Sequence, residues 1–280
     1  PASHSMLRLV FGLLLATACH GLGLGKKRVL VAGKGYAHLL IGSKCVQEGY
    51  RTSILVSEAE EAPKFFEDSV AKNLEFLPLN AFNAELLDRM DALIVAPDAP
   101  ATKNLMKSVL ADVAKMKNPK QLKLILSSFI GVDRTDEVFG EVWRANFIRG
   151  GDILRAQVME SYVNEEVPSL GCEVSYIRHG KLIGGGGKDG LGENSKFYNT
   201  FPEYNQLLTE RMHDNGQCDC EVAMGDTLPL EKTNRKALAN ACVAALELGP
   251  VTASVISKEG AIEKGPWAGV PEYKKLLQQV

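Results

Sequence analysis

The sequence contains no block of Lys and Arg residues, and its formal net charge is only −2 over 280 residues. A nucleic-acid surface needs clustered cations to neutralise phosphates, so we expect no nucleic-acid partner. The six cysteines include no CxxC pair, which argues against zinc-ribbon and thioredoxin motifs, and we expect no metal site. GxSxG, HExxH and a Walker A lysine are also absent. The composition, 45% hydrophobic and 24% charged, is that of an ordinary globular protein.

Long apolar runs are missing too. Residues 9–18 form an apolar run after Arg8 that ends among small residues. A run of about ten residues is too short to span a bilayer and is typical of a signal peptide. We therefore expect a signal peptide at residues 6–20, entry into the secretory route and no stable membrane span after its removal. A buried N-terminal helix is the alternative.

Short β-branched apolar runs alternate with longer amphipathic segments from residue 26 to residue 260. We expect strands at 28–33, 52–57, 73–79, 91–97, 122–128, 173–180 and 253–260. We expect helices at 36–48, 62–72, 102–115, 141–164 (interrupted near 150–151) and 234–249. This alternation predicts an α/β fold with a doubly wound parallel (Rossmann) sheet and helices on both faces. A glycine-rich loop at 184–190 and a C-terminal tail at 261–280, ending in a short surface helix, complete the prediction.

A glycine-rich turn, GKGYAH at residues 33–38, joins the first predicted strand to the first predicted helix. This is the place of the dinucleotide-binding fingerprint. Gly33 permits the tight turn, and Gly35 lets backbone N–H groups approach a pyrophosphate at the helix N-terminus. His38 stands where the fingerprint has its third glycine, so the helix must tilt away or the imidazole must point toward the ligand. The turn predicts NAD(P) as the cofactor.

The end of the second strand is the position that contacts the adenosine ribose. Ser57 and Glu58 stand there. A carboxylate at Glu58 accepts hydrogen bonds from the ribose hydroxyls and repels a 2′-phosphate, which favours NAD. Lys34 and Arg51 can pair with a 2′-phosphate, which favours NADP. Glu58 can equally be an exposed carboxylate at the start of a helix, so the choice between the two cofactors stays open.

Taken in order, these segments resemble the atypical short-chain dehydrogenase/reductase family, in its NmrA-like branch. The resemblance runs from about residue 28 to residue 260. Its carriers are VLVAGKGY, LDRMDALIVAP, LKLILSSFIGV, VSYIRHGKLIGG and NRKALANACVAALE. It implies a Rossmann sheet whose part from about residue 180 forms a small substrate or interaction region. The cofactor contacts that it implies are Gly33, Gly35, Tyr36 and Glu58 at the adenine half, and Pro97, Ser127, Ser128, His179 and Gly180 around the nicotinamide.

Reductases of this superfamily pass a proton from a Tyr whose pKa is lowered by a Lys four residues later. None of the seven tyrosines has Lys at that spacing, and the family's Lys position falls in RAQVMESY (residues 155–162). Arg155 can supply charge there, but its pKa is too high for proton transfer. The candidate catalytic residues are therefore Ser128, to orient a carbonyl, and His179, whose ordinary pKa suits proton transfer. Both are also residue types that serve structural roles at strand ends.

The sequence thus predicts an NAD(P)-binding protein without the YxxxK pair, non-catalytic or weakly catalytic, that works as a scaffold, assembly or redox-sensing protein. The resemblance implies a large complex, such as a photosynthetic assembly, as a partner besides the dinucleotide. With a signal peptide, it also implies the plastid of an alga with secondary plastids; secretion or the ER lumen is the alternative. Two other functions remain: an oxidoreductase acting on a small carbonyl or an activated double bond, and a sugar-nucleotide-type enzyme, which the missing pair disfavours.

Overall fold

The computed structural model describes residues 26–136, 140–148, 151–184, 219–258 and 270–279. The predicted signal peptide, most of the predicted glycine-rich loop and the first part of the predicted tail lie outside these ranges. None of the helices in the described ranges is both long enough and apolar enough to cross a membrane.

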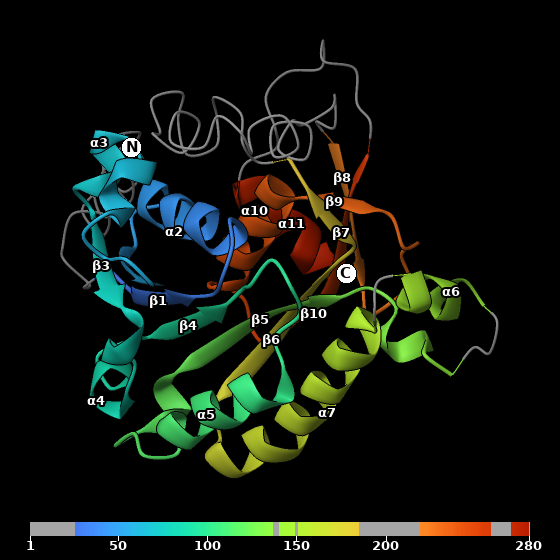
Figure 1. The fold of residues 1–280 in the computed structure, drawn as a ribbon, viewed down its shortest axis with the longest axis horizontal. Coiled ribbons are helices and arrows are strands. Elements are labelled where there is room, and N and C mark those ends of the chain that lie inside the picture. Colours follow the sequence, from blue (N-terminus) through green and yellow to red (C-terminus); the bar gives the residue numbers. More distant parts are fainter. Residues whose placement is uncertain (1–25, 137–139, 149–150, 185–218, 259–269, 280) are drawn as a thin grey trace, which may run out of the picture.

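Eight strands form the central sheet, and seven of them are parallel; β8 pairs antiparallel with β10 at one edge. In spatial order the strands are β3 (Leu74–Pro78), β2 (Arg51–Val56), β1 (Arg28–Ala32), β4 (Ala92–Val95), β5 (Lys123–Phe129), β6 (Glu173–His179), β10 (Thr252–Lys258) and β8 (Asp219–Met224). The order reverses between β1 and β4, which is the topological switch point where open α/β sheets bind ligands. The predicted doubly wound fold is confirmed (Figure 1).

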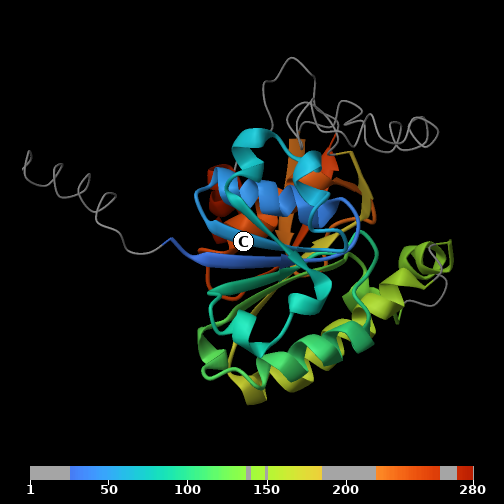
Figure 2. The same ribbon diagram turned by 60° about the vertical axis from the view of Figure 1, so that its left-hand side comes forward.

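Helices cover both faces of this sheet, as Figures 1 and 2 show. One face carries α2 (Ala37–Gln47), α10 (Arg235–Ala245) and α11 (Val270–Gln279), and the other carries α5 (Lys103–Val113) and α7 (Asp152–Leu170). Strands buried on both sides read as continuous apolar runs rather than as alternating ones, which is why they were recognisable in the sequence.

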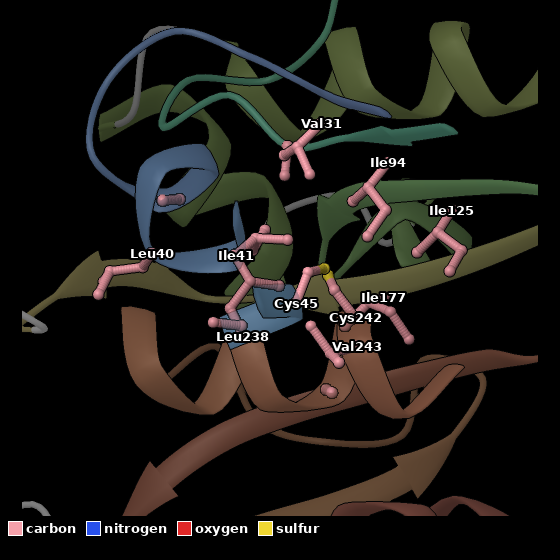
Figure 3. Packing of buried hydrophobic residues seen from close by; sticks show 14 of the residues in the cluster. Val31, Leu40, Ile41, Cys45, Ile94, Ile125, Ile177, Leu238, Cys242 and Val243 are labelled. Carbon is pink, nitrogen blue, oxygen red and sulfur yellow. The ribbon is translucent and has the colours of Figure 1, made fainter. Parts of the chain in front are cut away.

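The core beneath α2 and α10 is a row of aliphatic side chains from neighbouring strands. Val31, Ile94 and Ile125 occupy aligned positions on β1, β4 and β5. Ile41 of α2 and Leu238 of α10 pack onto the same cluster (Figure 3). This packing fixes α2, and therefore its N-terminus, over the carboxyl end of β1.

Smaller elements complete the fold. A two-stranded parallel sheet pairs β7 (Lys181–Ile183) with β9 (Lys232–Asn234). The short helices are η1 (Ala62–Phe65), α3 (Asp68–Ala71), η2 (Leu79–Ala81), α4 (Ala84–Leu87), η3 (Pro119–Gln121), η4 (Val132–Arg134) and α6 (Glu141–Ile148).

Two expectations from the sequence need correction. The helix predicted at 62–72 is instead the pair η1 and α3, because Phe66 and Glu67 have extended backbones between them. The tail helix is not simply a surface helix. Val270, Tyr273 and Leu277 of α11 recur at helical spacing and are buried, so α11 packs into the cluster beneath α10.

Candidate functional site

The turn between β1 and α2 lies at the switch point and needs both of its glycines. A Cβ on Gly33 would lie 2.7 Å from the Ala96 carbonyl oxygen and 2.8 Å from the Cβ of His38. Gly35 has a φ of +108°, which side chains rarely adopt. The predicted turn is therefore in place, and its shape depends on the absence of side chains at both positions.

A cavity of about 420 Å³ opens beside this turn, at the carboxyl ends of β1 and β2. Four of the residues predicted to contact the cofactor line this cavity, namely Gly33, Lys34, Gly35 and Glu58, and Glu58 is exposed at its rim. The full lining is Gly33, Lys34, Gly35, His38, Leu39, Val56, Ser57, Glu58, Ala62, Phe65 and Leu79. Cavities of about 560 and 880 Å³ lie elsewhere. Arg51, expected beside Lys34, instead begins β2 at the end of the strand opposite to Glu58 and lines the 560 Å³ cavity, so the structure does not bring it together with Lys34. The geometry at the switch point makes the smaller cavity the candidate site.

His38 answers the question raised by the missing third glycine. Its Cβ packs directly against the bare Cα of Gly33, so the helix approaches the strand closely without a third glycine. Its side chain is buried and lines the cavity. Burial lowers its pKa to about 4, although the charge of Asp98 and a hydrogen bond to the Gly35 backbone oppose the shift. The imidazole is therefore neutral at pH 7.

Asp98, which the sequence reading missed, occupies the N-terminus of α2. Its Oδ1 accepts a 2.7 Å hydrogen bond from the backbone N–H of Ala37. Its Oδ2 accepts bonds of 3.2 and 3.1 Å from Nε and Nη2 of Arg235. Asp98 lies three residues beyond the end of β4, the neighbour of β1, and its place in the sequence alone does not show that it turns toward α2. The site thus fits the adenosine half of a dinucleotide, while a carboxylate of the protein fills the place expected for the diphosphate.

Tyr36 and Pro97 are buried and do not line this cavity. Tyr36 is the N-cap residue of α2, but its side chain caps no helical N–H, and its ring joins the core cluster beneath α2. Pro97 links β4 to Asp98 and is buried. Both shape the surroundings of the turn.

Ser127, Ser128 and His179 lie at the carboxyl ends of β5 and β6. The register pairs Ser128 with Arg178 and Phe129 with His179. Successive side chains of a strand point to opposite faces, so this register directs Ser128 and His179 to different faces of the sheet. All three predicted residues are at most 3% exposed. The structure does not bring Ser128 and His179 together as an acid and its partner.

His179 and Gly180 are engaged with the protein itself. Nδ1 of His179 lies 2.7 Å from the Gly180 carbonyl oxygen, and its ring centroid lies 4.6 Å from that of Phe129. The N–H of Gly180 donates to Oγ1 of Thr233, and a Cβ on Gly180 would overlap the carbonyl oxygen of Glu231 at 1.6 Å. Gly180 is therefore required where β6 passes the segment leading into β9.

The inner face of α7 carries a carboxylate. Glu160 accepts hydrogen bonds of 3.1 and 2.6 Å from Nε and Nη2 of Arg178, and both residues are buried. Asp133 also pairs with Arg178. Arg155, proposed from sequence as a possible charge near the ligand, is 59% exposed and pairs with Asp152 at 3.1 Å. The charged group that α7 buries is thus Glu160.

No cluster of three or more His, Cys, Asp or Glu side chains with metal-binding geometry occurs in the part of the chain that the structure describes.

Comparison with known proteins finds likeness in structure and not in sequence. No family model matches the chain, and no curated protein matches it. A candidate NAD-dependent epimerase/dehydratase from Bacillus halodurans superposes with a TM-score of 0.57 at 13% identity, covering 91% of this chain and all of that one.

Two further solved structures also superpose on this chain at low sequence identity. A protein from Lactobacillus casei gives a TM-score of 0.53 at 11% identity, covering 82% of this chain and 98% of its own. The terminal R domain of the myxalamid PKS-NRPS pathway gives 0.52 at 14%, covering 92% and 79%. At these identities the likeness establishes the class of fold, an α/β protein with a Rossmann-like sheet.

Proposed function

We propose that this chain is an NAD(P)-binding protein of the short-chain dehydrogenase/reductase type, from its NmrA-like branch, and that it is non-catalytic or weakly catalytic. The observation that carries the proposal is the cavity at the switch point, which joins the glycine turn to Glu58. The fold likeness to a protein described as NAD-dependent supports the same cofactor class.

Among the residues that the structure describes, α7 carries no Tyr–Lys pair that could donate a proton, which supports the non-catalytic part of the proposal. Hydride delivery to a carbonyl leaves an alkoxide that must be protonated, and a positioned acid contributes roughly a hundred- to ten-thousand-fold. The buried face of α7 presents Ala156, Met159, Glu160 and Val163, and Glu160 is tied to Arg178. Both carboxylate oxygens of Glu160 already accept hydrogen bonds from Arg178, so the side chain is held by the protein and is not directed at a ligand. A scaffold, assembly or redox-sensing role requires no such donor. In such a role, bound dinucleotide stabilises one conformation for a protein partner.

Titration calorimetry of the purified protein with NAD, NADH, NADP and NADPH tests the binding claim. We expect heat with at least one of the four. Ser57→Trp fills the cavity from its exposed rim and should abolish that heat, whereas Glu60→Trp, on an exposed neighbour outside the lining, should not. Absence of heat with all four ligands contradicts the proposal, and equal binding by Ser57→Trp places the site elsewhere.

A second candidate function is an NAD(P)H-dependent oxidoreductase acting on a small carbonyl or an activated double bond. It is favoured by the hydroxyl of Ser128, which is buried at the carboxyl end of β5 and makes no hydrogen bond among the described residues. A hydroxyl at that position is available to orient a carbonyl oxygen. Turnover assays separate this function from the first.

A further inference from the structure

The N-terminus of α2 is capped by a residue from another strand. The side chain of Tyr36, the N-cap residue, does not cap an N–H of α2, and the first turn of α2 contains no acidic residue. The first N–H groups of a helix lack partners within the helix, and its dipole favours an anion there. Asp98 supplies both needs through its 2.7 Å bond from the Ala37 N–H. The anion-binding end of α2 therefore already holds an anion.

Asp98 is also fitted closely against Gly35. A Cβ on Gly35 would lie 2.6 Å from Cγ and 2.9 Å from Oδ2 of Asp98. The backbone N–H of Asp98 donates a 2.9 Å bond to the Lys34 carbonyl oxygen. The free space that a glycine creates for a pyrophosphate is, in this chain, the space that the Asp98 side chain occupies.

Arg235, at the first position of α10, holds the carboxylate in this place. Its side chain is 12% exposed. The guanidinium donates twice to Oδ2 of Asp98 and donates a 3.0 Å bond from Nη1 to the Gly184 carbonyl oxygen. Bonds between charged partners are about twice as strong as neutral ones. The turn, the N-terminus of α2 and the Arg235 guanidinium thus form one anion site, and the carboxylate of Asp98 occupies it.

We propose that Asp98 is an internal competitor for the diphosphate of the cofactor. A dinucleotide reaches the turn only when the Asp98 side chain leaves it, and Arg235 then faces the incoming diphosphate instead. The inference rests on the proposed dinucleotide function and deepens it, because it makes the anion position the regulated part of the site. A ligand without phosphate has no competitor, because the cavity beside Val56, Glu58 and Phe65 is separate from the carboxylate position.

Calorimetry with adenosine, ADP and NAD tests this with three variants. Asp98→Ala should bind ADP and NAD about tenfold tighter or better, a gain of about 1.4 kcal/mol, while adenosine binding changes less than about twofold. Asp98→Asn keeps an acceptor for the Ala37 N–H but loses the charge. Its affinities for ADP and NAD should lie between those of the wild type and those of Asp98→Ala. Asp91→Ala is the matched control, because Asp91 accepts an equally short 2.7 Å bond from the Arg28 N–H at the other end of β4. It should bind all three ligands like the wild type.

The outcomes separate the two proposals. If the wild type binds NAD and Asp98→Ala binds it no tighter, the competitor inference is wrong and the dinucleotide function stands. If adenosine gains as much as ADP, the substitution has merely enlarged the cavity, and the inference is again wrong. If no protein binds any ligand, the dinucleotide function fails and the inference fails with it.

A measurement on the wild-type protein guards against loss of folding in the Ala variant. In two-dimensional NMR, the Ala37 amide signal should move on addition of ADP and NAD, as its bond to Asp98 is replaced, and should move little with adenosine. An Ala37 signal that is unchanged at saturation with ADP overturns the inference.

Discussion

The carboxylate of Glu160 lies 2.6 Å from Nη2 of Arg178, and the pair is enclosed between α7 and β6. Burial acts to lower the pKa of Arg178, but its hydrogen bonds to Glu160 and Asp133 outweigh burial and raise that pKa above its usual value. Glu160 stands on α7, the helix that contains the segment RAQVMESY. The first consequence of this pairing concerns stability.

Arg178→Met should leave the carboxylate of Glu160 buried in the core without its cationic partner. Breaking a buried ion pair from one side costs about 3–5 kcal/mol in the free energy of unfolding. Lys258→Met is the control, because it breaks an ion pair with Glu221 in which both side chains are more than 40% exposed. An exposed pair contributes about 1 kcal/mol or less. Urea unfolding measures both losses, and equal losses would show that the Glu160–Arg178 pair is not effectively buried.

His38 should make the folded state sensitive to mild acid. Its pKa is lowered from 6.5 to about 4, so the unfolded chain binds the proton more readily. The stability that neutral His38 contributes is complete above about pH 6.5 and is lost as the pH falls toward 4, a loss of about 3 kcal/mol. His38→Gln keeps the carboxylate titrations and removes this one. Unfolding free energies at pH 7 and pH 4 should therefore differ less in the variant; an identical pH dependence contradicts the burial of a neutral imidazole.

Glu58 should set the preference between the two dinucleotides. Its carboxylate stands at the cavity rim, where it repels a 2′-phosphate. Glu58→Gln should therefore improve NADP binding relative to NAD binding by about tenfold or less, in calorimetric titrations of both ligands. Glu60→Gln removes a nearby exposed charge outside the lining and should leave the ratio unchanged. If both variants shift the ratio alike, the effect is one of net charge and not of position.

Reduction by a Tyr–Lys pair, the route of short-chain dehydrogenases/reductases, should be absent if the proposed function is correct. NAD(P)H oxidation with generic aldehydes, ketones and quinones should remain near background, and Ser128→Ala should change it little. Ser128 and His179 point to different faces of the sheet and cannot share a proton directly. Steady turnover that disappears both in Ser128→Ala and in His179→Ala would contradict the non-catalytic proposal and favour the oxidoreductase.

The sequence was most informative where structure is local. The parallel strands are continuous apolar runs, so the sheet was predictable. The glycine turn is identified by a pattern of six residues, so four of the cavity-lining residues were predictable as well. The three-residue strands β7 and β9 are too short to show a period, and β8 carries polar residues at the sheet edge; none of the three was predicted.

Ion pairs between residues far apart in the sequence could not be predicted from local sequence patterns. Asp98 and Arg235 are 137 residues apart, and nothing in the sequence around either residue indicates that they pair. Glu160 lay inside a segment already singled out, yet only the partner on β6 explains why a carboxylate is buried there. The place of Asp98 and the burial of Glu160 on α7 therefore could not be predicted until the packing of α2, α7 and α10 was known.

A crystal structure of the protein grown with saturating NAD tests the central claim most directly. We expect the adenosine to lie in the cavity beside Ser57, Glu58 and Phe65, with its diphosphate at the α2 N-terminus and the Asp98 side chain turned away from Ala37. Density for the dinucleotide at any other cavity, or an empty cavity at the glycine turn in saturated crystals, would contradict it.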